Sequence, residues 1–129
     1  MRIVIAPNTF KECLSAPAVA EAIAVGVKKV CPNAEILKIP LADGGDGTTE
    51  ALVSARNGRI VKMTANDPLM RPVKVHYGLF DQDRAAVVEM AVASGLWRLN
   101  VSEKNPLKTT TYGTGEMIRD ALNRGVQSM

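Results

Sequence analysis

The order of apolar runs near the N-terminus limits the possible folds more than any other feature of the sequence. Residues 3–6 form a continuous apolar run that Pro7 ends, as in a strand that is buried on both faces of a parallel sheet. Apolar side chains then recur at three- and four-residue steps between Val19 and Val30, which predicts a helix with one face on that sheet. A second strand is predicted at residues 36–40. The sequence therefore indicates a right-handed strand–helix–strand unit.

A glycine-rich loop follows the second predicted strand. Residues 43–48 read Asp-Gly-Gly-Asp-Gly-Thr, and a helix is predicted from Thr48 to about Arg56. Glycines let a ligand approach the backbone closely, and a helix N-terminus attracts anions. Ligands of open α/β sheets bind beyond the carboxyl ends of the strands, so we expect this loop and the loop at residues 8–12 to share one edge. A tight turn closed by an aspartate side chain is the alternative interpretation.

The glycine loop matches none of the common phosphate or metal loops. It has no lysine in the frame of a P-loop, and Glu50 stands where a dinucleotide-binding loop has its third glycine. The aspartates are three residues apart, whereas an EF-hand needs a spacing of two. Asp43 and Asp46 would repel a phosphate unless a cation lies between them or one of them acts as a base.

Three other segments carry candidate binding groups. Lys11 follows the first strand and could neutralise a phosphoryl group, although a lysine is most often a plain surface residue. Residues 109–111 are three threonines before a predicted helix, which suits either oxyanion contacts or a simple helix cap. Arg71 lies between Pro68 and Pro72 and could present its guanidinium to a substrate carboxylate, or it could be a solvated turn residue.

The second half of the chain has a different order of predicted elements. Three strands are predicted at residues 59–63, 73–80 and 85–90 with no helix between them, and a last helix is predicted with Gly113 or Thr114 as its N-cap residue. The expected fold class is α/β: a parallel sheet with flanking helices, Rossmann- or flavodoxin-like, plus an antiparallel three-strand segment from a second α/β domain. The expected parts are residues 1–58, 59–90 and 91–129. The chain looks as if it stops before a further strand.

Composition excludes several classes of function. The chain has 16 basic and 13 acidic residues and only one Trp, two Tyr and two Phe, which argues against a nucleic-acid binder. No apolar run approaches the roughly 20 residues of a membrane span, and no signal peptide is visible. Cys13 and Cys31 lack metal-ligand spacing and are expected to be buried free thiols in a reducing compartment. A soluble cytoplasmic protein is predicted.

Five blocks of sequence carry a family resemblance. They are residues 3–16 (IVIAPNTFKECLSA), 42–48 (ADGGDGT), 68–73 (PLMRPV), 89–96 (EMAVASGL) and 105–116 (NPLKTTTYGTGE). In order and spacing these blocks resemble the bacterial glycerate kinase family. The resemblance implies a transferase that uses ATP and Mg²⁺ to phosphorylate D-glycerate, a two-domain α/β enzyme with its active site between the domains.

Given this resemblance, we hypothesise roles for the candidate residues, because the resemblance itself identifies blocks of sequence and not roles. Asp43 would be the general base or, with Asp46, a magnesium ligand, and Lys11 would stabilise the transferring phosphoryl group. The remaining assignments are phosphate binding by Gly44, Gly45, Gly47 and Thr48, and positioning of the glycerate carboxylate by Arg71, Thr110 and Thr111.

The sequence departs from the family pattern at several points. The family usually has Asp-Ser where this chain has Asn8 and Thr9, and Glu where it has Asp46. Family members are several-fold longer and carry a later Gly-Gly-Ser-Ala-Thr-Asn-Asp-Gly-Gly block that is absent here. The alternative function is therefore an inactive N-terminal part or anion-binding domain of such a kinase. A flavodoxin-like flavin binder is a third possibility, which the few aromatic residues disfavour.

Overall fold

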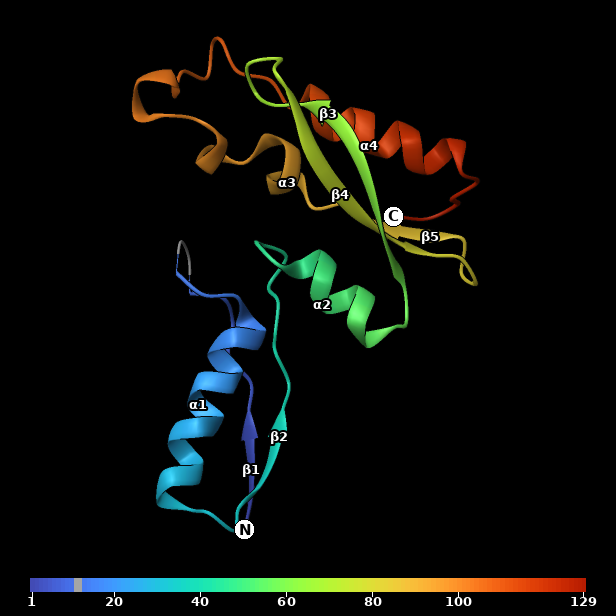
Figure 1. The fold of residues 1–129 in the computed structure, drawn as a ribbon. Coiled ribbons are helices and arrows are strands. Elements are labelled where there is room, and N and C mark those ends of the chain that lie inside the picture. The colour runs from blue at the N-terminus through green and yellow to red at the C-terminus, as the bar shows by residue number, and fades with distance from the viewer. Residues whose placement is uncertain (11–12) are drawn as a thin grey trace. The chain divides into compact units, whose positions relative to one another are not determined.

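The computed structural model describes residues 1–10 and 13–129 (Figure 1). By its contacts the chain divides into two compact units, Met1–Ala51 and Leu52–Met129. Each unit has its own hydrophobic core. Helix α2 (Thr48–Ala55) begins in the first unit and ends in the second. No helix in the described part of the chain is long and apolar enough to cross a membrane.

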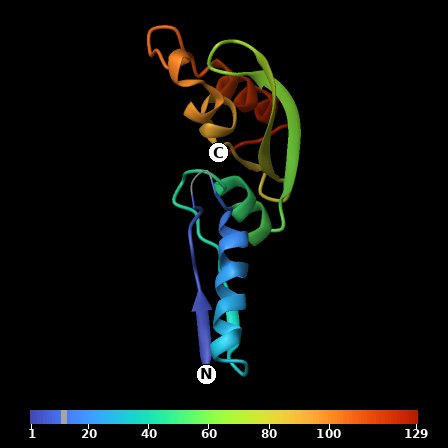
Figure 2. The ribbon, with the colours of Figure 1, turned by 60° about the vertical axis from the view of Figure 1, so that its left-hand side comes forward.

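The first unit is the predicted strand–helix–strand unit. Strands β1 (Arg2–Ile5) and β2 (Glu35–Lys38) pair in parallel, and α1 (Ala16–Val30) connects them and lies alongside the sheet (Figures 1 and 2). Ser15 is the N-cap residue of α1, but its side chain makes no capping hydrogen bond. The core forms between α1 and one face of the sheet, from Ile5, Ala20 and Ala24 with Ile3, Val27 and Ile36 packed against them.

The opposite face of this sheet is exposed, which corrects one prediction. The continuous apolar run at residues 3–6 predicted a strand buried on both faces, but Val4 is 55% exposed and its register partner Leu37 is 47% exposed. Side chains alternate between the two faces of a strand, and α1 packs on the face that carries Ile3 and Ile5. The prediction was therefore wrong for the face that carries Val4.

The second unit is an antiparallel sheet covered by helices. Strands β3 (Arg59–Asn66), β4 (Pro72–Phe80) and β5 (Ala85–Val87) pair in the order β3-β4-β5. Helices α3 (Met90–Ser94) and α4 (Tyr112–Asn123) pack against the sheet (Figure 1). Two short 3₁₀ turns, Leu96–Arg98 and Val101–Glu103, lie between these helices. The core includes Val61, Val75, Tyr77, Leu79, Val92, Ala93, Met117 and Ala121.

The N-terminal turn of α4 lies directly against the end of β3. A Cβ atom at Gly113 would lie 1.8 Å from the carbonyl oxygen of Asn66, so only glycine fits there. The backbone N–H of Asn66 and its Nδ2 both donate to Glu116 Oε2, at 2.8 and 3.0 Å. Helix α4 begins at Tyr112, with Thr111 as its N-cap residue. The predicted N-cap at residue 113 or 114 was thus two or three residues too late.

The two cysteines test a further expectation from the sequence. Cys13 and Cys31 are free thiols, as expected, but Cys13 is exposed and Cys31 half-buried, so the expected burial was wrong.

Near the other end of the chain, Ser128 forms a parallel bridge with Ala85, and the Ala86 N–H donates to the Ser128 carbonyl at 3.0 Å. The finer division of the chain at residues 58 and 90 stays a prediction.

Candidate functional site

The glycine loop is held in shape by its own first aspartate. Asp43 Oδ1 accepts a hydrogen bond from the Gly45 N–H at 3.0 Å, which closes a turn of the kind aspartates commonly form. Gly44 and Gly47 have φ angles of 92° and 88°, which disfavour any other residue. The aspartate-closed turn that the sequence left as an alternative is therefore present.

Helix α2 begins directly on this loop. The hydroxyl of Thr48 donates to the Gly45 carbonyl at 2.7 Å, and the Thr48 N–H approaches the same oxygen at 3.2 Å. The positive end of the α2 dipole is directed toward the loop. Asp43, Gly44, Gly45 and Asp46 are exposed, whereas Gly47 and Thr48 are half-buried. The loop is thus open to a ligand, but several of its polar groups are bonded to each other.

The loops that follow β1 and β2 lie side by side, as predicted. The Leu41 N–H donates to the Pro7 carbonyl at 2.9 Å, which continues the strand pairing toward both loops. A Cβ atom at Gly47 would lie 3.4 Å from the Thr9 methyl group. Asn8 Oδ1 accepts the Thr9 N–H at 2.7 Å. The remaining candidate of this edge, Lys11, lies outside the described residues.

Two carboxylates in the loop could serve a cation. Asp43 and Asp46 are both exposed, and Mg²⁺ in nucleotide enzymes is usually held by one or two carboxylates together with phosphate oxygens. Among the residues that the structure describes, no group of three or more His, Cys, Asp or Glu side chains could hold a metal by itself. Asp43 and Asp46 could therefore supply only part of the ligands of such an ion, and the rest would have to come from phosphate oxygens or water.

In the second unit, Arg71 is held by a buried aspartate. Asp67 is 2% exposed. Its Oδ2 accepts from Arg71 Nε at 2.6 Å, and its Oδ1 accepts the N–H groups of Leu69 and Arg71 at 2.8 and 2.9 Å. Burial by itself raises the pKa of Asp67, but the hydrogen bonds from Arg71 and Leu69 outweigh it, so the pKa lies below its ordinary value.

The Arg71 guanidinium makes two more contacts. Nη1 donates to Glu103 Oε1 at 2.8 Å, and Nη2 donates to the Arg98 carbonyl at 3.2 Å. These contacts with Asp67, Glu103 and Arg98 use three of the five N–H groups of the guanidinium, and the Arg71 side chain is 46% exposed. The group is fixed in position and still accessible. Its role toward a substrate carboxylate stays a prediction.

Residues 109–111, which we call the threonine loop, lie next to the turn that carries Arg71. The Thr110 N–H donates to the Pro68 carbonyl at 3.0 Å, and the Thr110 hydroxyl oxygen accepts the Tyr112 N–H at 3.1 Å. Thr111 is exposed at the start of α4, and its side chain makes no capping hydrogen bond. The structure therefore brings Arg71 and Thr110 onto neighbouring segments of one unit, whereas the glycine loop belongs to the other unit.

Sequence reasoning missed the side chains that hold Arg71. Asp67 stands four residues before Arg71, a spacing that could have indicated their pairing. Glu103 is 32 residues away in the sequence and also accepts the Asn100 N–H at 2.9 Å. Nothing in the local pattern links Glu103 to Arg71, so only the fold could reveal this contact.

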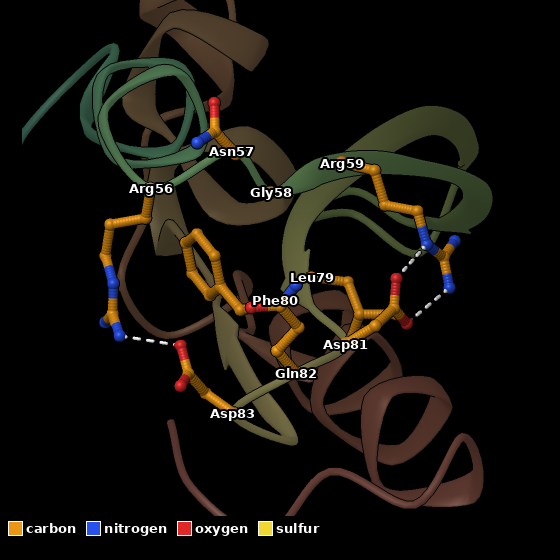
Figure 3. Close-up of a pocket in the computed structure, with 9 residues that line it drawn as sticks. All are labelled: Arg56, Asn57, Gly58, Arg59, Leu79, Phe80, Asp81, Gln82 and Asp83. Carbon is orange, nitrogen blue, oxygen red and sulfur yellow. Dashed lines mark hydrogen bonds and ion pairs between the residues drawn. The ribbon is translucent and has the colours of Figure 1, made fainter.

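A hollow of about 280 Å³ in the second unit contains none of the candidate residues (Figure 3). Its charged groups are already paired: Arg56 Nη2 lies 2.7 Å from Asp83 Oδ2, and Arg59 contacts both oxygens of Asp81 at 2.7 and 3.0 Å. Phe80 lies beneath Arg56, whose guanidinium carbon is 5.1 Å from the ring centre. The hollow therefore shows no catalytic grouping.

Comparison with known proteins gives one consistent family. The sequence profile of the Glycerate kinase family matches residues 3–129. The chain is 50% identical to a protein named glycerate kinase from Bacillus subtilis (strain 168), and it is 41% identical to one named glycerate 2-kinase from Escherichia coli (strain K12). Each match covers 100% of this chain and 34% of the relative.

A solved structure agrees with the sequence relatives. The crystal structure described as glycerate kinase 2 from Salmonella typhimurium LT2 is 52% identical, with a TM-score of 0.74. The match covers 98% of this chain and 34% of the other. The chain thus spans about a third of the length of the relatives it matches.

Proposed function

The chain belongs to the glycerate kinase family, and from this membership we propose that the protein transfers the γ-phosphoryl group of ATP to a hydroxyl of D-glycerate. The observation that carries the proposal is the family match over residues 3–129. The site geometry supports it, because an exposed glycine loop at a helix start suits phosphate and a fixed, accessible arginine suits a carboxylate.

The glycine loop is proposed to hold the phosphates of the nucleotide. Backbone N–H groups of Gly44, Gly45 and Gly47 and the hydroxyl of Thr48 are the proposed donors. In the described conformation the Gly45 N–H donates to Asp43 and the Thr48 hydroxyl donates to Gly45. A phosphate would therefore have to replace these internal acceptors.

The two loop aspartates are proposed to serve the acceptor hydroxyl and the metal. Asp43 would take the proton of the attacking glycerate hydroxyl or, with Asp46, hold Mg²⁺. When bound, Mg²⁺ supplies positive charge that offsets the charge on the phosphate oxygens. Asp43 combines a carboxylate with an exposed position in the loop, which both roles require.

The groups that position glycerate are proposed to come from the second unit. Arg71 would bind the glycerate carboxylate, with Thr110 and Thr111 contributing polar contacts. Lys11 would stabilise the phosphoryl group in transit. Phosphoryl transfer depends mainly on such positioning and charge stabilisation, and the contacts of Arg71 with Asp67 and Glu103 already limit its movement.

A grafted enzyme tests this proposal. This chain replaces the matched third of the Bacillus subtilis relative, and ATP-dependent phosphorylation of D-glycerate is followed in a coupled assay. We expect turnover that requires both ATP and Mg²⁺. A folded, monodisperse graft that phosphorylates no glycerate, while the parent kinase is active in the same assay, would contradict the proposal.

For the isolated 129-residue chain the second candidate function is anion binding without turnover. It is favoured by the observation that the chain spans about a third of its relatives. Titration calorimetry with ATP and with inorganic phosphate measures the binding, and the coupled assay measures turnover. Measurable glycerate kinase activity of the isolated chain would exclude this second candidate.

A further inference from the structure

Two hydroxyl groups meet where helix α3 contacts helix α4 (Figure 1). Ser94 is the last residue of α3, Thr114 lies in the first turn of α4, and their side-chain oxygens are 2.8 Å apart. Both residues are half-buried. Ser94 belongs to the sequence block at residues 89–96, and Thr114 belongs to the block at residues 105–116. The pair therefore joins two of the blocks that carry the family resemblance.

The packing beside the pair fixes its position. Ala93 is fully buried, and a Cβ atom at Gly113 would lie 3.3 Å from the Ala93 Cβ. The two helices are thus in close contact at the residues that precede Ser94 and Thr114. Gly115, which follows Thr114, is exposed, and a Cβ atom there would meet nothing within 4 Å. The hydroxyl pair is therefore held in place by packing and remains partly accessible.

The two hydroxyl groups cannot satisfy each other completely. Each hydroxyl carries one hydrogen and can accept two hydrogen bonds. Their mutual bond uses one of the two hydrogens, whichever oxygen donates. Neither Ser94 Oγ nor Thr114 Oγ1 bonds to another group in the described part of the chain. The pair therefore retains one hydrogen and several acceptor positions for a further polar group.

Hydrogen bonds within the second unit connect the pair to the groups proposed to position glycerate. The Thr114 N–H donates to the carbonyl of Thr111 at 3.0 Å. On the side of α3, Arg98 Nε donates to the Val92 carbonyl at 2.7 Å, and the Arg98 carbonyl accepts from Arg71. The hydroxyl pair, the threonine loop and the Arg71 guanidinium thus belong to one hydrogen-bonded framework.

We propose that the Ser94–Thr114 pair binds the hydroxyl group of glycerate that does not accept the phosphoryl group. That hydroxyl both donates and accepts hydrogen bonds, and the pair offers the complementary acceptors and donor. The glycerate carboxylate only accepts and carries a charge, so the Arg71 guanidinium matches it better. The inference rests on the proposed phosphorylation of glycerate and adds the groups that recognise its second hydroxyl.

The pair would make the enzyme select acids with a second hydroxyl group. A site that hydrogen-bonds a substrate hydroxyl rejects an analogue without it, because polar groups of the site are then left unpaired. D-Lactate lacks the hydroxyl at carbon 3 of glycerate, and 3-hydroxypropanoate lacks the hydroxyl at carbon 2. Whichever position is phosphorylated, one of these analogues therefore lacks only the hydroxyl that the pair recognises.

Substitutions in the grafted kinase test the role of each hydroxyl. Thr114→Val replaces one hydroxyl by a methyl group of similar size, and Ser94→Ala removes the other. We expect each to raise the KM for D-glycerate roughly tenfold, while kcat and the KM for ATP stay within about twofold. The double variant should raise this KM little further, because the two hydroxyls act as a pair. The coupled assay measures all three constants.

Two substitutions serve as matched controls. Thr114→Ser keeps the hydroxyl, so its KM for D-glycerate should stay within about threefold of the parental value. Ser102→Ala removes an exposed serine hydroxyl from the same unit and should change none of the three constants. Thermal unfolding checks that each variant folds, and Ser94→Ala carries the test by itself if Thr114→Val does not fold.

Competitive inhibition by the two analogues separates recognition from a structural defect. Thr114→Val and Ser94→Ala should weaken the binding of D-glycerate but leave unchanged the inhibition constant of the analogue that lacks the recognised hydroxyl. A structural defect would weaken the binding of glycerate and of both analogues alike.

The outcomes distinguish this inference from the proposed function. An active grafted kinase whose KM for D-glycerate is unchanged by Thr114→Val and Ser94→Ala would overturn the role of the pair and leave the proposed function intact. Equal losses for glycerate and both analogues, or a Thr114→Ser variant as impaired as Thr114→Val, would have the same meaning. A folded graft that phosphorylates no glycerate would overturn both.

Discussion

At the scale of single residues, Asp43 offers the sharpest test of the proposed chemistry. Asn at position 43 retains an oxygen that can accept the Gly45 N–H, so the turn observed at 3.0 Å should persist. Only the charge and basicity are lost. In the grafted kinase we expect Asp43→Asn to lower kcat by about two orders of magnitude or more. Near-parental turnover in the coupled assay would remove Asp43 from the catalytic groups.

Substitution of the buried Asp67 should lower the free energy of unfolding more than substitution of an exposed aspartate. Asp67→Asn removes the charge that faces Arg71 from a buried position, and we expect urea unfolding at pH 7 to show a loss of about 1–3 kcal/mol. The matched control is Asp83→Asn, which breaks the exposed pair with Arg56 and should cost less than about 1 kcal/mol. Equal losses in the two variants would contradict the special role of Asp67.

The lowered pKa of Asp67 predicts that the stability of the protein depends on pH. The pKa of Asp67 is lower in the folded protein than its ordinary 3.8, so the stability it contributes is present above that pH and is lost as the pH falls toward the folded pKa. The difference between parent and Asp67→Asn should therefore shrink when unfolding is measured below about pH 3.8. A difference that stays constant across this range would refute the link to Asp67 ionisation.

At the scale of elements, the approach of α4 to β3 depends on one glycine. Gly113→Ala places a methyl group where the Asn66 carbonyl lies 1.8 Å away, and we expect a loss of at least about 2 kcal/mol. Gly115→Ala, two residues later in α4, meets nothing within 4 Å and should be neutral or stabilising by up to about 1 kcal/mol. Thermal unfolding of both variants measures the contrast.

A buried tyrosine joins β4 to α4. Tyr77 is fully buried and its hydroxyl donates to Asp120 Oδ2 at 2.7 Å. Burial and this hydrogen bond raise the pKa of Tyr77 to about 12. The associated stability is present below pH 10 and is lost as the pH rises toward 12. Tyr77→Phe should cost about 1–2 kcal/mol at pH 7, and this cost should diminish above pH 10 in urea unfolding experiments.

Sequence periodicity predicted the helices and strands better than it predicted which residues pack against them. The helix predicted from the apolar steps between Val19 and Val30 corresponds to α1, and the strand predicted at residues 73–80 corresponds to β4. The exposure of Val4 could not be predicted, since a continuous apolar run reads the same whether or not a neighbour covers it. Likewise, the contact of Glu103 with Arg71 joins residues far apart in the sequence.

At the scale of the whole molecule, the two units differ in how much apolar surface they bury. The core of the first unit is a small cluster around Ile5 and Ala20, whereas the second unit has a larger cluster around Tyr77 and Met117. Protection from hydrogen exchange follows the extent of buried contacts. We therefore expect amides of β1 to exchange faster than those of β4 in the isolated chain. Equal protection would show that the first unit has stability beyond its own core.

The residues proposed to take part in the reaction are distributed over both units. The glycine loop belongs to the first unit, and the groups around Arg71 belong to the second. In the sequence, only the family resemblance connects these segments, because no local pattern joins them. The structure adds the network around Arg71, whereas the assignment of Asp43, Lys11 and the threonines stays a prediction for the grafted kinase to test.

The turn that Asp43 closes has a consequence for selectivity. Because the Gly45 N–H is occupied by Asp43, an anion can use it only in the fraction of molecules whose turn has opened. Apparent affinity falls in proportion to that fraction. A ligand with one weak contact loses most of its occupancy, whereas a polyphosphate gains enough additional interactions to offset the opening. The turn would thus make the loop select for polyphosphates over anions that make a single contact.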